Sequence, residues 1–187
     1  MTSNNKIIVW MQMSLDGRTR GPDGAFDWAF VGGDLHRHFV DTLRDAGAFL
    51  YGRRVYEMMA SFWPTADEQP GSTPMQADYA KIWRPMPKLV FSRSLATADW
   101  NGTVVREIGP AVRDRLDGDA YLFGGAETVH AFAERDLIDE YQIFVHPILL
   151  GGGTPLFPEL PARQAMSLVE TRTFDDTVAG LRFARAR

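Results

Sequence analysis

The chain of 187 residues contains no cysteine. Disulfides, thiolate metal sites and a cysteine nucleophile are therefore excluded, and the lack of disulfides agrees with a reducing compartment. No apolar run approaches the roughly 20 residues that a membrane-spanning helix needs. The N-terminal segment lacks the charged and apolar stretches of a secretion signal. We therefore expect a cytoplasmic protein with no membrane partner.

The sequence also lacks an excess of positive charge. It has 20 lysine and arginine residues against 24 aspartate and glutamate residues, which gives a formal net charge of -4. A general nucleic-acid partner is not expected, because neutralising a row of phosphates needs a basic face. Histidines that could chelate a metal ion together are missing too. His36 and His38 are two residues apart in an expected helix, and His130 and His146 have no visible partner. We expect no metal site.

Hydrophobic residues make up 45% of the chain. A chain of this length buries about 70% of the surface that its unfolded form exposes, so its hydrophobic core can be stable without disulfides or a structural metal ion. The sequence has no internal repeat, low-complexity tract or domain linker. We expect residues 1–187 to form a single domain.

Apolar runs and helical patterns alternate along the chain. Strands are expected at 7–13, 48–51, 88–92, 103–106, 120–123 and 141–150, and helices at 34–46, 55–59 and 127–137. Prolines mark residues 64–87 as irregular. Segments 166–174 and 177–183 alternate more clearly around the turn Asp175-Asp176. The pattern predicts an α/β fold, with a mixed, mostly parallel central sheet flanked by helices and closed by a C-terminal antiparallel hairpin.

The most informative junction is Gly124-Gly125. It lies where the apolar run ending at Phe123 meets the helical pattern that starts near Glu127. Unpaired amides and the dipole of a helix N-terminus stabilise an anion, and glycine lets a ligand approach the main chain. A nucleotide is the obvious candidate. The Gly-x-Gly-x-x-Gly fingerprint of a classical dinucleotide fold is missing.

Several motifs occur in a characteristic order. They are Ser14-Leu15-Asp16-Gly17, Tyr51-Gly52-Arg53-Arg54-Val55-Tyr56-Glu57, Phe91-Ser92-Arg93-Ser94, Leu122-Phe123-Gly124-Gly125-Ala126 and Gly151-Gly152-Gly153-Thr154-Pro155-Leu156-Phe157. Together they resemble the dihydrofolate-reductase-like fold over residues 6–185. The resemblance is closest to the C-terminal reductase domain of bacterial riboflavin-biosynthesis deaminase-reductases, in its stand-alone form.

This resemblance implies NADPH as the cofactor. The glycine turns would hold its pyrophosphate, and Ser92 and Arg93 would lie near the adenosine 2′-phosphate. Guanidinium groups suit that dianion, so Arg53 and Arg93 favour NADPH over NADH. The cofactor-binding residues that it implies are Gly17, Gly52, Arg53, Arg54, Ser92, Arg93, Phe123, Gly124, Gly125, Ala126, Glu127 and Thr128.

The resemblance also implies catalytic positions. Gln12 would lie beside the nicotinamide ring, and Asp16 and the loop through Trp28 would form a lid. Asp34 is near the place where folate-reducing relatives carry the carboxylate that binds the pterin. Aspartate is also a preferred helix N-cap. Both interpretations of Asp34 stay open from the sequence alone.

The function that follows is an NADPH-dependent reductase of a small substrate. The acceptor would be a pterin-like or pyrimidine-like heterocycle, or a carbonyl compound. The alternative is a non-catalytic NADP(H)-binding or scaffold protein, which would bind the cofactor without turnover. The resemblance further implies a homodimer, formed through an exposed sheet edge or the apolar run 141–150.

Overall fold

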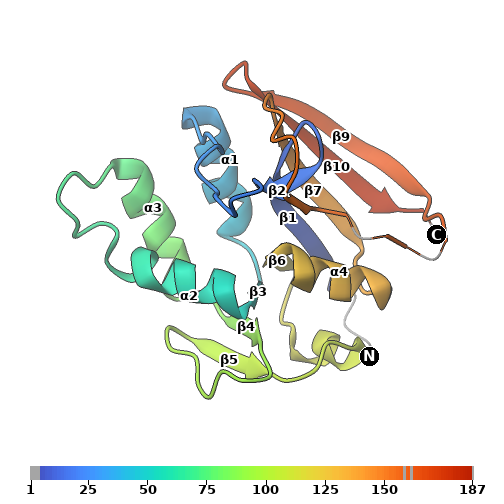
Figure 1. Cartoon of the computed structure of the whole chain (residues 1–187). Coiled ribbons are helices and arrows are strands. Elements are labelled where there is room, and N and C mark those ends of the chain that lie inside the picture. The colour runs from blue at the N-terminus through green and yellow to red at the C-terminus, as the bar shows by residue number, and fades with distance from the viewer. Residues whose placement is uncertain (1–4, 158, 161, 187) are drawn as a thin grey trace.

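The computed structural model describes residues 5–157, 159–160 and 162–186. Helices and strands alternate until two long strands end the chain (Figure 1). The strands are β1 (Ile7–Ser14), β2 (Arg18–Arg20), β3 (Ala48–Gly52), β4 (Lys88–Phe91), β5 (Gly102–Val105), β6 (Ala120–Gly124), β7 (Glu140–His146), β8 (Thr154–Pro155), β9 (Met166–Phe174) and β10 (Val178–Arg185). The α-helices are α1 (Gly33–Leu43), α2 (Arg53–Phe62), α3 (Pro74–Trp83) and α4 (Ala126–Glu134), with short 3-10 helices at Trp63–Thr65 and Pro110–Arg115.

The main sheet has eight strands in the order β5-β4-β3-β6-β1-β7-β10-β9. In this order, the first six strands, β5, β4, β3, β6, β1 and β7, are parallel to one another. Strand β10 is antiparallel to β7, and β9 is antiparallel to β10. Strands β2 and β8 form a separate two-stranded ladder. These pairings confirm the predicted mixed, mostly parallel sheet and its closing hairpin.

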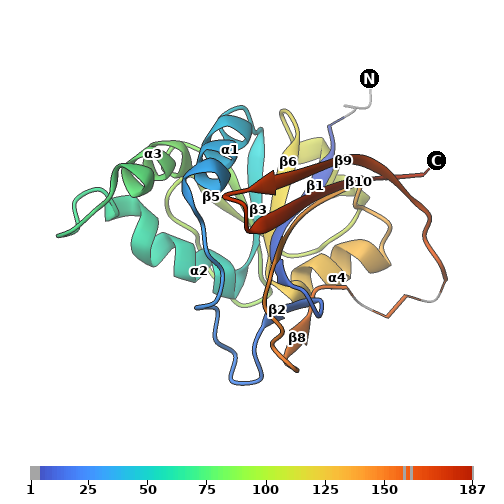
Figure 2. The same ribbon diagram turned by 90° about the horizontal axis from the view of Figure 1, so that it is seen from above.

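Helices cover both faces of this sheet. Successive side chains of a strand point to opposite faces, and β1 shows the division. Ile7 and Val9 pack in one buried cluster with Phe132 of α4, whereas Ile8 and Trp10 pack in a second cluster with residues of α1, α2 and α3. Figure 2 shows α1 and α4 on opposite sides of the sheet. No helix in the described part of the chain is long and apolar enough to cross a membrane.

The prediction of an irregular segment over 64–87 was wrong, because this segment contains α3. Thr73 begins the helix with a capping box. Its Oγ1 accepts a hydrogen bond from the Gln76 N–H, and its own N–H donates to Gln76 Oε1 at 2.8 Å. Pro74 occupies the first turn, where a missing N–H costs nothing. Pro74 therefore marks where the helix begins rather than preventing it.

The apolar run 141–150 is also shorter as a strand than predicted. Strand β7 ends at His146, just before Pro147, and proline cannot donate to a sheet ladder. Hydrogen-bonded neighbours flank β7 on both sides, namely β1 and β10. The apolar character of β7 reflects burial inside the sheet, so this strand is not an exposed edge through which a dimer could form.

Candidate functional site

Two helices begin directly at the carboxyl ends of neighbouring parallel strands. Strand β3 leads into α2 and β6 leads into α4, with Gly52 and Gly125 at the N-cap positions. The strands are paired, and Tyr51 lies opposite Gly124. No described side chain caps either helix. The first-turn amides and the positive ends of two helix dipoles therefore lie side by side, an arrangement that stabilises an anion.

The glycines at these turns allow close approach of the main chain. A Cβ atom on Gly52 would lie 2.2 Å from Thr128 Oγ1, in the first turn of α4. Gly124 has φ of +80°, and a Cβ there would lie 3.3 Å from Met11 Sδ. The peptide bond between Gly124 and Gly125 is cis. A larger residue at Gly52 would push apart the two turns that the sequence predicted to act together, and one at Gly124 would crowd Met11 of β1.

Arginines flank the start of α2. Arg53 donates from Nε to Glu57 Oε1 at 2.7 Å and from Nη1 to Ser94 Oγ at 2.9 Å. It therefore links the helix to the loop that follows β4. Arg54 and Glu127 form a loose ion pair of 3.8 Å, and both side chains are exposed. These exposed and half-exposed charges therefore flank the N-terminus of α2.

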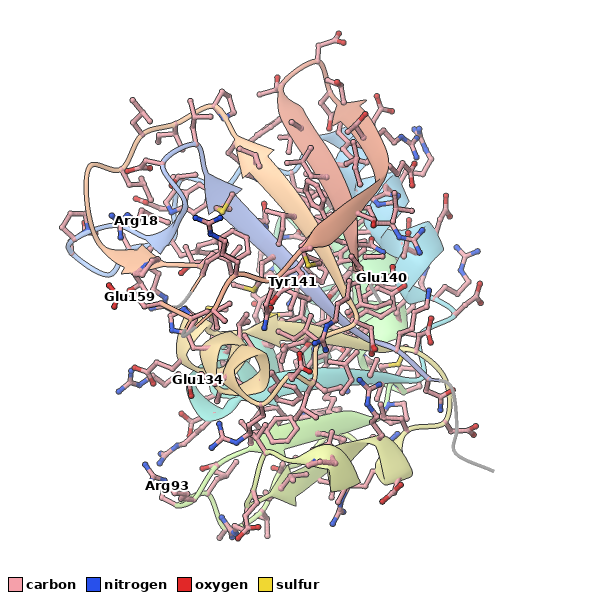
Figure 3. All side chains as sticks on the ribbon, turned by 90° about the vertical axis from the view of Figure 1, so that its right-hand side faces the viewer. Arg18, Arg93, Glu134, Glu140, Tyr141 and Glu159 are labelled. Atoms are coloured by element: carbon pink, nitrogen blue, oxygen red, sulfur yellow. The ribbon has the colours of Figure 1, made fainter. Side chains whose placement is uncertain are left out.

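The loop after β4 brings further cationic groups to the same rim. Ser92 Oγ accepts from the Leu95 N–H at 3.0 Å, and Arg106 donates from Nη1 to the Ser92 carbonyl oxygen at 2.8 Å. Arg93 is exposed and extends outward from this loop (Figure 3). Because Arg53 reaches Ser94 of the same loop, three guanidinium groups are associated with the segment that the sequence predicted to lie near the 2′-phosphate.

Two other implied cofactor contacts are largely enclosed by the protein. The Phe123 ring lies 4.9 Å from that of Phe49 and 5.4 Å from that of Tyr51. Ala126 is buried in the first turn of α4. Their side chains support the turn, so a ligand would meet mainly backbone atoms at these positions.

Asp34 neither caps α1 nor lies in an enclosed site. The N-cap is Gly32, and the Asp34 carboxylate is 58% exposed and pairs with Arg37 at 3.0 Å. The capping carboxylate belongs to Asp175, in the turn between β9 and β10. Its Oδ1 accepts from the Asp34 N–H at 2.9 Å, and its Oδ2 accepts from the Leu35 N–H at 3.1 Å. The capping interpretation of Asp34 was therefore wrong, since the residue stands inside the first helical turn.

Asp16 fastens the predicted lid to the loop between β7 and β8. Its Oδ1 accepts from Ser14 Oγ at 2.7 Å and from the Leu150 N–H at 3.0 Å, and its Oδ2 accepts from the Gly151 N–H at 2.9 Å. These hydrogen bonds, led by that of Ser14, lower the pKa of Asp16 to about 2. The neighbouring Gly17 has φ of +79° and closes the turn. Asp16 is thus a carboxylate that anchors the loop and has no proton to donate at neutral pH.

Among the described residues, six buried side-chain polar atoms have no hydrogen-bond partner, and three of them belong to residues at or near the carboxyl ends of β1 and β7. They are Gln12 Oε1, Trp28 Nε1 and His146 Nε2. Ser14 is paired with His146 across the two strands, so Gln12, two residues before Ser14, shares the face of His146. The Trp28 ring stands edge-on to the His146 ring at 5.4 Å. Buried polar groups are normally hydrogen-bonded, and such a cluster indicates a site for a polar ligand.

His146 is the residue of this polar cluster that the sequence did not reveal. Its side chain is buried, and burial lowers the pKa of the imidazole. The ring is therefore neutral at neutral pH and offers one N–H and one acceptor nitrogen. The sequence showed one sign of a role for His146, namely a polar residue at the end of a buried strand. The residues that surround His146 come from distant parts of the chain, so the sequence did not show them together.

A cavity of about 350 Å³ lies beneath the lid loop beside this polar cluster. Trp28 borders both features. The other residues that line the cavity are Gly21, Pro22, Asp23, Ala25, Asp27 and Leu150. Leu150 lines the cavity, and its N–H donates to Asp16 Oδ1. The hydrogen bonds of Asp16 therefore also hold one wall of the cavity in place.

The structure is that of an α/β protein with an uncapped helix pair and a polar cluster at the carboxyl ends of its parallel strands. The chain belongs to the RibD C-terminal domain family, whose model matches residues 5–179. It is 31% identical to the uncharacterised protein YyaP of Bacillus subtilis over 186 residues, covering 95% of each chain. It is 28% identical to the uncharacterised YwjB of the same organism, covering 97% of this chain and 98% of that one.

Solved structures share the fold. A Shewanella sp. PV-4 protein assigned to riboflavin biosynthesis has a TM-score of 0.75 and 23% identity, covering 97% of this chain and 99% of that one. The deaminase/5-amino-6-(5-phosphoribosylamino)uracil reductase of Thermotoga maritima has a TM-score of 0.64 and 14% identity, and Acinetobacter baumannii RibD has 0.61 and 20%. This chain covers 57% and 58% of those two longer proteins. The predicted resemblance to this reductase-domain family, and its fold, are confirmed.

Proposed function

We propose that this protein is an NADPH-dependent reductase of a small heterocyclic substrate of the pterin or pyrimidine kind, or of a carbonyl compound. The observation that carries the proposal is the pair of adjacent, uncapped helix N-termini at Gly52 and Gly125. A pyrophosphate is the anion that such paired amides suit. Membership of a family of NADPH-using reductase domains supports the same cofactor.

The arginines at the rim favour NADPH over NADH. Arg53 and Arg106 are already tied to the loop that carries Ser92 and Arg93. Guanidinium groups form short, paired hydrogen bonds with a phosphate dianion. We therefore assign the adenosine 2′-phosphate to this loop, with Arg93 as the residue that is free to turn toward it.

The end of β1 would separate cofactor from substrate. Met11 lies against Gly124 on the face covered by α4, whereas Gln12 faces the opposite side with His146. When bound, NADPH supplies a hydride, and the protein must orient the acceptor and exclude water. The lid anchored by Asp16 would cover the polar cluster, with Trp28 forming its inner wall.

The polar cluster indicates what part of the substrate it holds. The Trp28 indole donates, the Gln12 carbonyl oxygen accepts, and the neutral His146 ring can donate from Nε2. A flat heterocycle with an uncharged amide or imide edge would satisfy all three. Since Asp34 points to solvent and pairs with Arg37, it would not provide a carboxylate for a charged edge.

The test is a titration of the purified protein with NADPH and with NADH, followed by nicotinamide fluorescence. We expect NADPH to bind more tightly. Arg93→Ala should weaken NADPH binding by about tenfold, the loss of one charge-assisted hydrogen bond, and leave NADH binding unchanged. Arg115→Ala, which removes another exposed arginine, is the matched control. If neither nucleotide binds, the proposal is wrong.

Turnover with a panel of acceptors then separates catalysis from binding alone. The panel contains 7,8-dihydrofolate, lumazine and simple aldehydes, and oxidation of NADPH is followed by absorbance. Tight NADPH binding with no oxidation by any acceptor of these classes would favour the alternative of a non-catalytic NADP(H)-binding protein. The cytoplasmic location stays a prediction from the sequence.

We also propose that the protein works as a homodimer. Strand β7 lies inside the sheet and cannot form the interface. The support for a dimer is the edge strand β9, whose residues from Ser167 to Thr173 are all exposed.

A further inference from the structure

His146 is a titratable group that the fold buries and leaves without a partner. The residue is only 2% exposed, and its Nε2 atom has no hydrogen-bond partner among the described residues. It ends β7, where Ser14 of β1 lies opposite it. Buried polar atoms are normally hydrogen-bonded. A ligand atom bound at Nε2 would therefore satisfy a group that the protein itself leaves open.

Trp28 links His146 to the cavity beneath the lid. Its ring stands edge-on to the His146 ring at 5.4 Å, and the same residue lines the cavity of about 350 Å³. A movement of Trp28 with the lid would uncover the imidazole to a molecule that enters from this cavity. Gln12, whose Oε1 also has no partner, shares the face of His146.

The acidic groups near the polar cluster are already engaged. Asp16 accepts hydrogen bonds from a hydroxyl and two amides, and these hold its pKa at about 2. The Ser14 hydroxyl donates to Asp16 and accepts from the Arg18 N–H. Asp34 is exposed and paired with Arg37. None of these side chains has a proton to give to a ligand at neutral pH.

The other three histidines lie elsewhere. His130 Nε2 is within hydrogen-bond distance of two backbone carbonyl oxygens around β8. His38 packs among aromatic rings between α1 and the sheet. His36 lies beside Asp78 of α3. Within the described residues, His146 is therefore the histidine that belongs to the polar cluster.

We propose that His146 delivers the proton that accompanies hydride transfer, to a substrate whose reducible C=N or C=O bond lies beside an amide edge. Trp28 Nε1 and Gln12 Oε1 suit the carbonyl oxygen and the N–H of that edge, which leaves His146 Nε2 for the heteroatom of the reducible bond. The inference rests on the proposed reductase function and assigns a catalytic residue to it.

The step balances in atoms and electrons. The acceptor carbon receives the hydride of NADPH, so a C–H bond forms there while the C–H bond at nicotinamide C4 breaks with its electron pair. The π electrons of the C=N or C=O bond move to the heteroatom. That atom takes the proton from Nε2 of the protonated ring, whose N–H bond breaks, and the ring becomes neutral. NADP⁺ is the oxidised product, and solvent later returns a proton to Nε2.

The surroundings of His146 set the direction of its pH dependence. Burial alone lowers the pKa of the imidazole below its ordinary value of 6.5. Its neighbours Ser14 on β1 and Trp28 in the lid carry no charge, and β10 contributes Ala179 beside it. The protonated ring is the acid, and its fraction grows about tenfold for each unit by which the pH falls toward that pKa. kcat/KM should therefore rise as the pH falls from 8 and level off below the pKa.

Steady-state oxidation of NADPH with 7,8-dihydrofolate and with lumazine tests the assignment. Both acceptors carry a C=N bond beside an amide edge. His146→Gln keeps a hydrogen-bond donor but has no proton to transfer, so kcat should fall at least about a hundredfold. KM and NADPH binding should change less than about threefold, and the rise at low pH should disappear. His36→Gln is the matched control, because His36 Nε2 is also buried without a partner and its pKa is also lowered by burial.

A second measurement does not depend on turnover. Long-range ¹H–¹⁵N spectra of the free wild-type protein follow the imidazoles over pH, and His146→Gln identifies the signals of His146. We expect a midpoint below 6.5 that agrees with the midpoint of kcat/KM, since kcat/KM reports the free protein. A His146 ring that does not titrate above about pH 4 would overturn the assignment, because it would hold no transferable proton.

The kinetic outcomes separate this inference from the function on which it rests. If the wild type oxidises NADPH and His146→Gln keeps its kcat and its pH profile, the proton comes from elsewhere and the reductase proposal stands. Equal losses in His146→Gln and His36→Gln would also overturn the assignment. If the wild type binds NADPH but oxidises it with neither acceptor, the proposed function fails and the role of His146 fails with it.

Discussion

The cofactor side and the substrate side of the proposed site are built differently. On the cofactor side, short contiguous motifs at the ends of β3 and β6 place glycines and helix N-termini together. On the substrate side, Gln12, Trp28 and His146 come from three separate segments. A local motif is visible in the sequence, because its residues are neighbours in the chain. The polar cluster exists only because β1, β7 and the lid loop meet.

The two sides also differ in their energetics. Backbone amides at a helix N-terminus are exposed at little cost, since water can satisfy them until a ligand arrives. Each buried polar atom without a partner costs about 1–3 kcal/mol. The substrate side therefore destabilises the free protein in a way that the cofactor side does not, and the variants below test this difference.

The largest effect is expected from Gly124→Ala. The positive φ of Gly124 costs an alanine about 1 kcal/mol, and the new methyl group would crowd Met11. We expect NADPH binding to weaken by more than tenfold in a fluorescence titration. Gly71→Ala is the control, because Gly71 also has a positive φ but open space around it. Equal loss of NADPH binding in both variants would show that backbone strain alone, and not the glycine turn, is responsible.

A smaller effect is expected from Gln12→Met, which should raise stability and lower catalytic efficiency. This substitution keeps the side-chain volume but removes the buried, unpartnered Oε1. We expect the free energy of unfolding to rise by about 1 kcal/mol, while kcat/KM for the substrate falls about tenfold and NADPH binding is unchanged. Urea denaturation and steady-state kinetics measure the two quantities. Gln142→Met, in β7, is the control. A variant that loses stability without losing turnover would contradict a substrate role for Gln12.

The smallest effect is expected from Asp175→Asn. The change removes one of the two oxygens that cap α1, and asparagine tolerates the positive φ of this position. We expect a loss of about 1 kcal/mol in the free energy of unfolding. Asp34→Asn should change stability by less than about 0.5 kcal/mol, because its carboxylate is exposed. Thermal unfolding compares them. A larger loss at Asp34, or loss of turnover there, would restore its sequence-based role.

Much of the fold could be predicted because its signals are local. Continuous apolar runs predicted the buried parallel strands, and the acidic turn at Asp175-Asp176 predicted the hairpin. The signal for α3 was also present, in Thr73, Pro74 and Gln76. It was missed because the prolines were weighed as helix breakers, although proline in a first turn favours a helix.

The remaining features depend on contacts between distant residues. Asp175 caps α1 from the far end of the chain, so no spacing near Asp34 could reveal it. His146 looked isolated because the Trp28 ring contacts it, and Gln12 comes to share its face of the sheet, only in the folded chain. The same holds for β7, whose apolar residues fit an edge or an interior strand equally well until its neighbours are known.

The sequence by itself determined most of the helices and strands, the glycine turns and the family. These follow from the periodicity of side chains and from residues with special backbone freedom, both of which act over a few positions. Only the tertiary structure decided which carboxylate caps α1, which polar atoms remain unsatisfied and which strand lies at the edge. Those properties arise when strands far apart in the chain become neighbours, since burial and hydrogen bonding depend on what each side chain finally touches.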